Sequence, residues 1–320
     1  MISIPAPLVR GLAASVTAVA VATATAILGP ATAVASPARA AAPVTDTCPG
    51  AKPEVTVFKE GGVPVLDWRE NLEFDGRGTL WVSHAARGVE GYRPDGTRYA
   101  AVDVPSPAGI RRGPDGAMYV NYGQIPVPNG SGIMRFDPRH PERAPEKVVD
   151  GLLGINGLAI DGAGNFYLGR EFAPTVLKLR PDGSRDERWT AAADVFGTNG
   201  LAVADGTLYT TSTVHPRSPV EAVPLDDPGA HRRLADLSGS PLDFKGLDDL
   251  TVVGDHLYAV AFVTGQIIRV DRGTGAACVV VAGLHGPTSA RAPLGFGSHD
   301  PQRELFVTEA SGRILRVRMP

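Results

Sequence analysis

Leu80-Trp81-Val82-Ser83 is the first of six segments in which a large apolar residue precedes an aromatic one and two smaller residues follow. Successive segments start 38 to 49 residues apart. A repeat of about 45 residues that holds only short strands is typical of the blades of a β-propeller. The sequence therefore predicts an all-β, six-bladed propeller whose second strands begin at Leu80, Met118, Phe166, Leu208, Leu257 and Leu305.

Turn sequences separate these segments, as such a fold requires. The 320 residues include 38 Gly and 28 Pro, and Pro-Asp-Gly recurs at 94–96, 114–116 and 181–183. Pro presets φ at the first corner of a turn, and Gly tolerates a positive φ further on. Because each blade buries its faces only against its neighbours, we expect residues 54–320 to form one domain.

The last blade lacks a strand that the N-terminal region can supply. We expect blade 6 to begin near Leu294-Gly295 and to end at Arg316-Val317-Arg318, which leaves room for only three strands. An alternating segment at 54–58 precedes blade 1. Pairing of this segment with residues 313–318 would close the ring and leave no long sheet edge exposed.

The first forty residues have the character of a secretory signal peptide. Arg10 precedes an uncharged run rich in Ala, Val and Thr at 11–29, and small-residue cleavage sites such as Ala33-Val34-Ala35 follow. The alternative is an uncleaved anchor, because the run is nearly long enough to span a bilayer. We expect a signal peptide at 1–40, a flexible Ala/Pro-rich lead-in at 41–53, and a secreted protein without a membrane span after cleavage.

The chain contains two cysteines, Cys48 and Cys278. In an exported protein such a pair favours one disulfide, with two free thiols as the alternative. Ring closure through residues 54–58 would bring Cys48 beside the outer strand of blade 5, which contains Cys278. The predicted topology therefore favours the disulfide.

Charge and composition argue against a nucleic-acid partner. The formal net charge is −3, from 31 Lys and Arg against 34 Asp and Glu. No stretch combines clustered Lys or Arg with interleaved aromatic residues, as a nucleic-acid surface does. We expect a small-molecule substrate or ligand, and a monomeric protein.

The residues that open the inner strands indicate where a site would lie. In a propeller these strands start around one axial mouth, so residues far apart in sequence meet there. Four of the six starts carry an oxygen ligand, namely Glu70, Asn156, Asn199 and Asp248. Two carboxylates and two carboxamides form a hard donor set that suits one Ca²⁺, or Mg²⁺ or Mn²⁺ with more water, and carboxylates can also bind Zn²⁺. The alternative is that these residues only open turns.

The same segments carry a family resemblance. Glu70-Asn71-Leu72-Glu73-Phe74-Asp75, with Gly78-Thr79-Leu80-Trp81-Val82, resembles the opening Glu-Gly-Pro…Asp…Gly-x-Leu motif of the senescence marker protein 30/gluconolactonase family. Asn199-Gly200-Leu201 resembles that family's Ser-Asn-Gly-Leu blade. Asn156-Gly157 stands where the family has Asn-Asp-Gly, and Leu247-Asp248 stands where it has Pro-Asp-Gly.

The resemblance covers residues 54–320 and implies a calcium-type propeller of six blades. The chain departs from related propellers at three places. Ala108 stands where paraoxonases have a catalytic His, and Leu294-Gly295-Phe296 stands where the squid-type phosphotriesterase has a His. Gly154-Ile155 replaces an Arg and a Phe of the gluconolactonases, so the substrate-binding residues differ. The resemblance implies that the metal ligands are Glu70, Asn156, Asn199 and Asp248.

Further polar residues near the mouth are candidates for chemistry or binding. Asp248 could be both ligand and base, and His84, at the end of a second strand, could act as a general base near neutral pH. Arg170 could hold an anionic or carbonyl group, although Glu171 beside it could simply pair with it. We therefore expect Asp248 and His84 as catalytic residues, and Arg170, Asn71 and Asp249 as substrate-binding residues.

Two functions fit this sequence. The first is a metal-dependent hydrolase of lactones or small esters, in which the cation polarises the carbonyl group. The second is a non-catalytic secreted propeller whose ion fixes the mouth while the rim binds a sugar, a peptide or a cell-wall fragment. A metal-free repeat propeller is disfavoured, because all four oxygen ligands are present.

Overall fold

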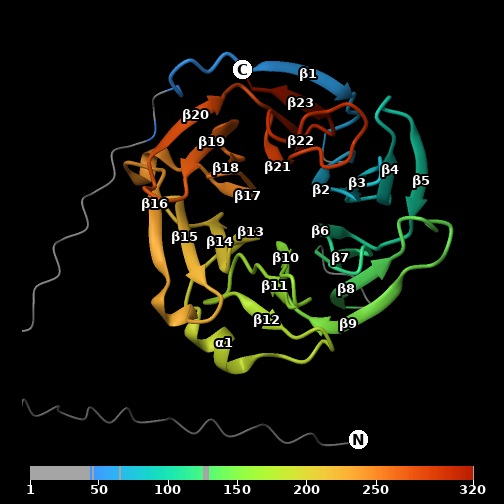
Figure 1. The fold of residues 1–320 in the computed structure, drawn as a ribbon, viewed down its shortest axis with the longest axis horizontal. Coiled ribbons are helices and arrows are strands. Elements are labelled where there is room, and N and C mark those ends of the chain that lie inside the picture. Colours follow the sequence, from blue (N-terminus) through green and yellow to red (C-terminus); the bar gives the residue numbers. More distant parts are fainter. Residues whose placement is uncertain (1–43, 45–46, 65, 125–129, 320) are drawn as a thin grey trace, which may run out of the picture. The chain divides into compact units, whose positions relative to one another are not determined.

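The described residues build six small antiparallel sheets around one axis, and Figure 1 shows them following one another in chain order. The structure is a computed structural model that describes residues 44, 47–64, 66–124 and 130–319. The predicted signal peptide, 1–40, lies outside these residues. Each sheet is one blade with its first strand innermost, so the predicted six-bladed all-β propeller is confirmed.

Four of these blades have four consecutive strands. Their second strands are almost wholly buried, because both of their faces pack against neighbouring blades. The blades consist of β2 (Arg69–Phe74), β3 (Leu80–His84), β4 (Gly88–Tyr92) and β5 (Arg98–Val102); β6 (Pro107–Arg112), β7 (Met118–Tyr122), β8 (Ser131–Phe136) and β9 (Glu146–Leu152); β13 (Thr198–Ala204), β14 (Thr207–Ser212), β15 (Pro219–Pro224) and β16 (Arg232–Asp236); and β17 (Leu247–Val253), β18 (His256–Ala261), β19 (Gln266–Asp271) and β20 (Ala277–Val281).

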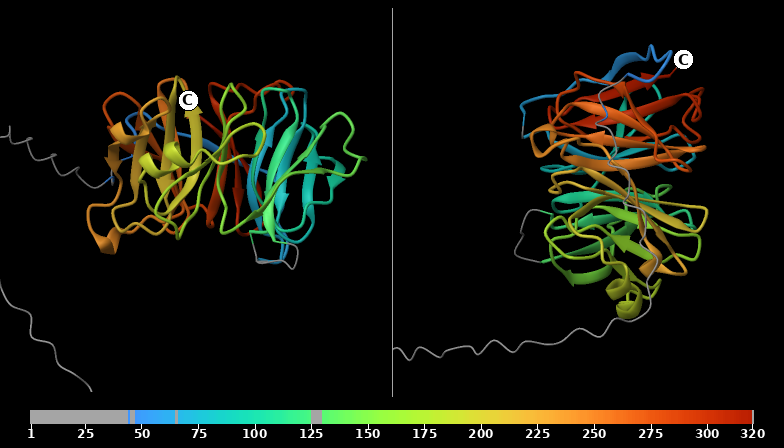
Figure 2. Two further views of the ribbon diagram at one scale, coloured as in Figure 1. Left: turned by 90° about the horizontal axis from the view of Figure 1, so that it is seen from below. Right: turned by 90° about the vertical axis from the view of Figure 1, so that its left-hand side faces the viewer.

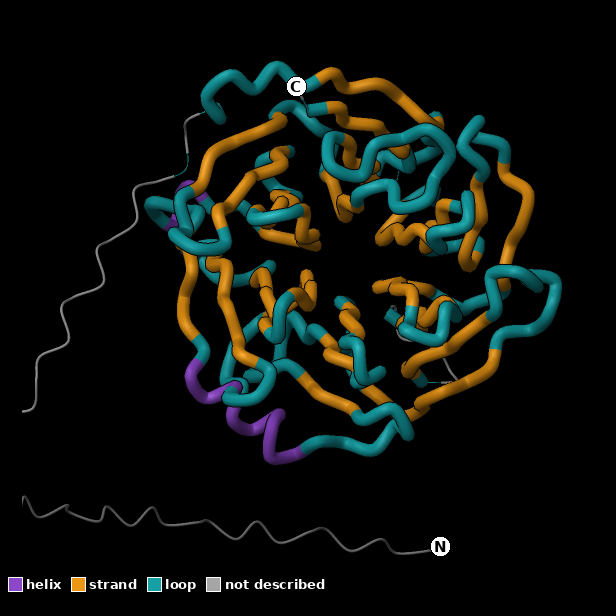
Figure 3. The backbone as a smooth tube through the Cα atoms, in the orientation of Figure 1, coloured by secondary structure: helices purple, strands orange, loops and turns teal. Residues whose placement is uncertain are grey.

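Blade 3 differs from the expected pattern at its outer edge. It consists of β10 (Leu158–Ile160), β11 (Phe166–Leu168) and β12 (Leu177–Leu179), and the helix α1 (Glu187–Ala192) follows β12. Asp186 caps this helix, because its side chain accepts a hydrogen bond from the backbone N–H of Trp189. Figure 3 shows the helical segments on the outside of the ring.

The prediction for the start of blade 6 is wrong. The inner strand is β21 (Pro287–Arg291), followed by β22 (Glu304–Glu309) and β23 (Ile314–Arg318). Leu294 and Gly295 instead lie in the loop after β21, where Leu294 is exposed. β21 does not show the apolar alternation expected of a buried strand, because it contains Thr288 and Ser289. The side chains of these two residues are buried among other polar groups rather than in an apolar core.

The N-terminal strand closes the ring as predicted. β1 (Glu54–Lys59) pairs antiparallel with β23, with Glu54 opposite Arg318, and becomes the outer strand of blade 6. Figure 1 shows β1 lying along the outside of β23. Phe58 joins an aromatic cluster with Phe296 and Phe306, so closure also buries apolar surface.

A disulfide joins Cys48 to Cys278, as the topology predicts. Thr47 pairs in parallel with Val279 of β20, and the Cys48 amide donates to the Val279 carbonyl oxygen at 2.9 Å. This described part of the lead-in segment therefore lies against the outer strand of blade 5. The bond links residues 230 positions apart and holds the closing strand to the ring.

Removing this cross-link should destabilise the fold strongly. For a closed loop of 230 residues, the chain-entropy description gives about 5 kcal/mol as an upper value. We expect the double variant Cys48→Ser/Cys278→Ser to unfold at a clearly lower urea concentration than the oxidised wild type. Reductant should move the wild-type transition toward that of the variant, and coincident transitions for all three samples would contradict the prediction.

Loops gather at the two ends of the blades, as the side views in Figure 2 and the tube in Figure 3 show. Inner strands begin, and second strands finish, at the same end, because the two strands are antiparallel. We call this end the mouth face. Among the residues that the structure describes, no helix has the length and apolar character needed to cross a membrane.

Candidate functional site

The mouth face holds a cavity of about 470 Å³ on the axis. Its wall combines the starts of four inner strands with the ends of the neighbouring second strands. The four residues predicted to bind metal all line it. The lining residues are Trp68, Glu70, Ala85, Gln124, Asn156, Glu171, Asn199, Thr213, Asp248 and Phe262.

Two carboxamides donate hydrogen bonds to two of the carboxylates of this cavity. The side-chain amide of Asn199 donates to Oδ1 of Asp248 at 2.8 Å and to Oε1 of Glu171 at 2.9 Å. The Asn156 amide donates to the same Glu171 oxygen at 3.2 Å. Glu171, expected only as a possible partner of Arg170, thus belongs to the cluster.

The cavity carries negative charge that no basic side chain offsets. Within the described part of the chain, every ion pair uses a carboxylate other than those of Glu70, Glu171 and Asp248. Burial, and then the charges of Glu70, Asp249 and Glu171, raise the pKa of Asp248 well above its usual value. Burial also raises the pKa of Glu171, with a further contribution from Glu70.

Glu70 is held at the edge of the cavity by two neutral donors. The Gln124 amide donates to its Oε1 at 2.8 Å, and the Trp68 indole N–H donates to its Oε2. The Trp68 ring also stacks on Phe262, with ring centroids 5.6 Å apart. One wall of the cavity is therefore aromatic, while the carboxylates lie among polar side chains and Ala85.

The donor chemistry of the cavity fits a hard divalent cation. Glu70, Glu171 and Asp248 offer carboxylate oxygens, and Asn156 and Asn199 offer carboxamide oxygens. Among the described residues, no group of three or more His, Cys, Asp or Glu side chains meets the geometry of a metal site by itself. The two carboxamides would therefore have to complete the ligand set.

Close contact between blades explains why Gly109, Gly157 and Gly200 stand near the starts of three inner strands. A Cβ at Gly109 would lie 2.7 Å from the carbonyl oxygen of Asn156, and one at Gly200 would lie 2.5 Å from that of Asp248. Gly is thus needed where the inner strands converge. This packing fixes the backbone positions of Asn156 and Asp248.

A second set of contacts positions the residues that open the inner strands at the mouth face. These contacts were not predicted from the sequence. Polar side chains near the ends of second strands bond to the next blade. Asn121 donates to the carbonyl oxygens of Asn156 and Gly157 at 2.9 and 3.0 Å, and Thr211 donates to that of Asp248 at 2.5 Å. Ser83 donates likewise to the carbonyl oxygen of Ala108. In the sequence, these contacts are indicated by a polar residue at the fourth position in most of the six segments that form the second strands.

Asn71 and Asp249 do not line the mouth cavity. They lie in a buried polar layer with Arg111, Ser289 and Arg291, all from inner strands. Asp249 is 1% exposed and pairs with Arg111 at 3.0 Å and with Arg291 at 2.9 Å. Asn71 bridges Arg111 and Asp249, and Ser289 donates to Asp249 at 2.5 Å. We call these five residues the axial layer; its burial argues against direct contact with a substrate.

His84 and Arg170 also lie outside the cavity lining. His84 is fully buried, 3.4 Å from Asp67, and its Nδ1 lies 3.2 Å from the backbone N–H of Ala86. Burial lowers the pKa of His84, and the charge of Glu90 only partly offsets this. Arg170 donates to the carbonyl oxygen of Thr175.

The buried His84 predicts acid sensitivity. In the unfolded chain its pKa is about 6.5, whereas in the folded protein it is lower, so the unfolded state binds the proton more readily. His84 therefore lowers the free energy of unfolding as the pH falls below about 6.5, and it has no such effect at higher pH. We expect His84→Gln to lose less stability than wild type between pH 7.5 and 5.5 in urea unfolding. His285→Gln, at an exposed position, should behave like wild type.

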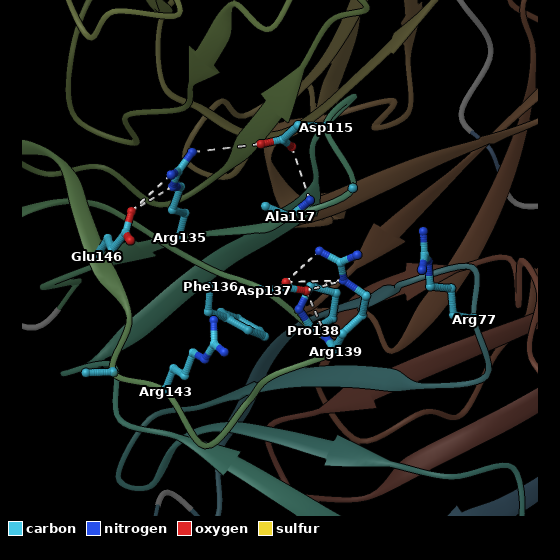
Figure 4. Close-up of a pocket in the computed structure, with 12 residues that line it drawn as sticks. Arg77, Asp115, Ala117, Arg135, Phe136, Asp137, Pro138, Arg139, Arg143 and Glu146 are labelled. Carbon is cyan, nitrogen blue, oxygen red and sulfur yellow. Dashed lines mark hydrogen bonds and ion pairs between the residues drawn. The ribbon is translucent and has the colours of Figure 1, made fainter.

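Figure 4 shows a different cavity of about 370 Å³, lined by strand-connecting loops at the end opposite the mouth. Its acidic groups are paired with arginines. Arg139 contacts Asp137 at 2.7 Å, and Arg135 contacts Glu146 at 3.0 Å. Because those carboxylates are already paired, this cavity is a poorer cation site than the mouth.

Comparison with known proteins places the fold but not the activity. No model of a protein family matches the sequence, and a search of curated proteins finds no match either. Solved structures do match. A gluconolactonase from Xanthomonas campestris has a TM-score of 0.62 at 19% identity, over 88% of this chain and 99% of that one.

Solved structures of proteins with other functions in their names match about as well. An auxiliary nutrient binding protein from Bacteroides ovatus has a TM-score of 0.64 at 12% identity, over 84% of this chain and 77% of that one. A virginiamycin B lyase from Staphylococcus aureus has a TM-score of 0.56 at 10% identity, over 84% and 100%. At these identities the shared feature is the fold, which is the one implied by the resemblance to the gluconolactonase family.

Proposed function

We propose that this protein is an exported hydrolase of lactones or small esters that works with one divalent cation, most suitably Ca²⁺, at the mouth cavity. The observation that carries the proposal is the group of three unpaired carboxylates and two carboxamides around an open cavity. The disulfide and the predicted signal peptide support an extracellular location. The likeness to a gluconolactonase fold supports the substrate class by analogy only.

Glu70, Asn156, Asn199 and Asp248 would hold the cation, with Glu171 as a further ligand. When bound, a divalent cation there would supply positive charge to polarise a carbonyl oxygen. Asp248, whose carboxylate lines the cavity, would also accept a proton from the attacking water. Water adds to the lactone carbonyl, the ring C–O bond breaks, and the ring oxygen receives a proton, so the product is a hydroxy acid.

The test combines metal content with activity. Purified protein should contain about one divalent ion per chain by elemental analysis, and a panel of five- and six-membered lactones and aryl esters should show turnover that chelator removes and Ca²⁺ restores. Chelator should also lower the melting temperature, because the ion binds only the folded state. Turnover that persists in excess chelator would overturn the proposal.

A non-catalytic binding propeller is the second candidate. The likeness in fold to a nutrient binding protein supports this candidate by analogy only. If metal-loaded protein hydrolyses nothing on the panel but binds a ligand at the mouth, this second function is supported instead.

A further inference from the structure

Exposed apolar side chains are concentrated on the mouth face. Phe172 is 81% exposed in the loop after β11, and Leu242 is fully exposed in the short 3-10 helix Pro241–Asp243; both lie at this end of the blades. Leu66 and Leu153 are further exposed examples, in the loops before β2 and β10. Scattered exposed apolar residues need no explanation, but a concentration on one face often marks a binding surface.

Part of this apolar surface lies next to residues of the mouth cavity along the chain. Phe172, Val214 and Val263 are exposed, and each directly follows a residue that lines the cavity. A Cβ on Gly197 would lie 3.1 Å from the Val214 side chain, so the neighbouring Phe196, also exposed, belongs to the same region. We call Phe172, Phe196, Val214 and Val263 the apolar rim.

The cavity itself has an apolar part, formed by Trp68 and Phe262, beside its carboxylates. The carboxylate cluster lies where the inner strands meet, whereas Phe262, which stacks on Trp68, directly precedes Val263 of the rim. Trp68 turns its N–H toward Glu70 and its ring toward Phe262. A ligand that matches both parts has a polar reacting group and a hydrocarbon chain.

We propose that the apolar rim binds the hydrocarbon chain of the substrate, so that the site prefers lactones or esters with an alkyl chain over polyhydroxylated sugar lactones. This inference rests on the proposed hydrolase function for its catalytic part. The reacting carbonyl group lies at the carboxylate cluster, and the chain crosses Phe262 toward Phe172 and Val263. Each methylene that leaves water for this surface strengthens binding.

The test is a series of five-membered lactones that carry alkyl chains of zero, two, four, six and eight carbons, with gluconolactone for comparison. We expect kcat/KM to rise about two- to fourfold per methylene over the first four carbons. In Phe172→Ser/Val263→Ser this gain should shrink, so that the loss relative to wild type grows with chain length. Leu294→Ser is the matched control, because Leu294 is 56% exposed but lies in the loop after β21, at the end of the blades opposite the mouth; it should keep the wild-type profile.

Binding separates this inference from the proposed activity. Lactams with the same alkyl chains are not hydrolysed, and calorimetry on metal-loaded protein should show their affinity rising with chain length. If no lactone is turned over, the hydrolase proposal fails, while chain-dependent lactam binding still supports the rim. Affinity that is independent of chain length overturns the inference. So does light scattering that shows self-association of wild type but not of Phe172→Ser/Val263→Ser, because the rim would then bind a second copy.

Discussion

Asp248→Asn should abolish calcium-dependent lactone hydrolysis while the propeller stays folded. Asn keeps the shape of the side chain but removes a charged ligand, and affinity at oxygen sites follows ligand charge. We expect kcat/KM to fall by roughly 100-fold or more, since changes even to groups that only support metal ligands cost up to about that much. The measurements are steady-state kinetics and elemental analysis of the purified variant.

Thermal unfolding gives this prediction a second readout. In metal-free protein the pKa of Asp248 is higher in the folded state than in the unfolded chain. As the pH rises above the pKa of the unfolded state, the unfolded chain loses this proton more readily, so Asp248 lowers the free energy of unfolding. Asp248→Asn should therefore raise the melting temperature without Ca²⁺ and remove the increase caused by Ca²⁺. In wild type, Ca²⁺ at one hundred times its Kd would add about 2.7 kcal/mol. Asp227→Asn, at an exposed position, should change neither value, and calcium stabilisation that survives in Asp248→Asn would exclude the site.

The second large effect is expected in the axial layer. Asp249→Ala would leave Arg111 and Arg291 buried without their shared carboxylate. Removing one partner of a buried ion pair typically costs about 3–5 kcal/mol, because the other charge stays desolvated. We expect a loss of that size in the free energy of unfolding, measured with urea in excess chelator so that metal loss does not contribute.

An exposed ion pair supplies the control for this experiment. Glu146 contacts Arg135 at 3.0 Å, but the Glu146 side chain is 69% exposed. Exposed pairs contribute about 0–1 kcal/mol, so Glu146→Ala should lie close to wild type. Similar losses for Asp249→Ala and Glu146→Ala would show that the axial layer adds little beyond a surface contact.

Most of the fold could be predicted because its signals are local and repeated. The large apolar-aromatic pairs in the second strands mark all six blades, and the alternating segment at 54–58 identifies the closing strand. β21 was missed because its Thr288 and Ser289 are satisfied by other polar groups near the axis. The helix α1 was not predicted, because a fourth strand was expected after β12. Only the packing of blade 3 shows that a helix takes its place.

The candidate site was predictable only where symmetry places residues. Glu70, Asn156, Asn199 and Asp248 open inner strands, so the propeller geometry alone brings them to one mouth. Asn71 and Asp249 lie one residue further on, and alternation along a strand turns them to the axial layer. The partners Arg111 and Arg291 give no sign in the sequence that they lie on the axis. Both His84 and Glu171 follow second strands in the sequence, so the sequence does not show which of them reaches the cavity. In the structure His84 is buried in its blade and Glu171 lines the cavity.

The closure of blade 6 sets an order for the formation of the native contacts. β1 is made first and its partner β23 last, so β1 has no sheet to join until nearly the whole chain is available. Cys48 and Cys278 can join earlier, as soon as blade 5 exists, and β1 starts only a few residues after Cys48. Once the disulfide has formed, β1 is held close to the place where β23 will lie. The two strands then pair at a high effective concentration instead of having to meet across the whole chain. A reduced chain keeps its two unpaired strand edges open for longer, and those edges are where association with other chains would start.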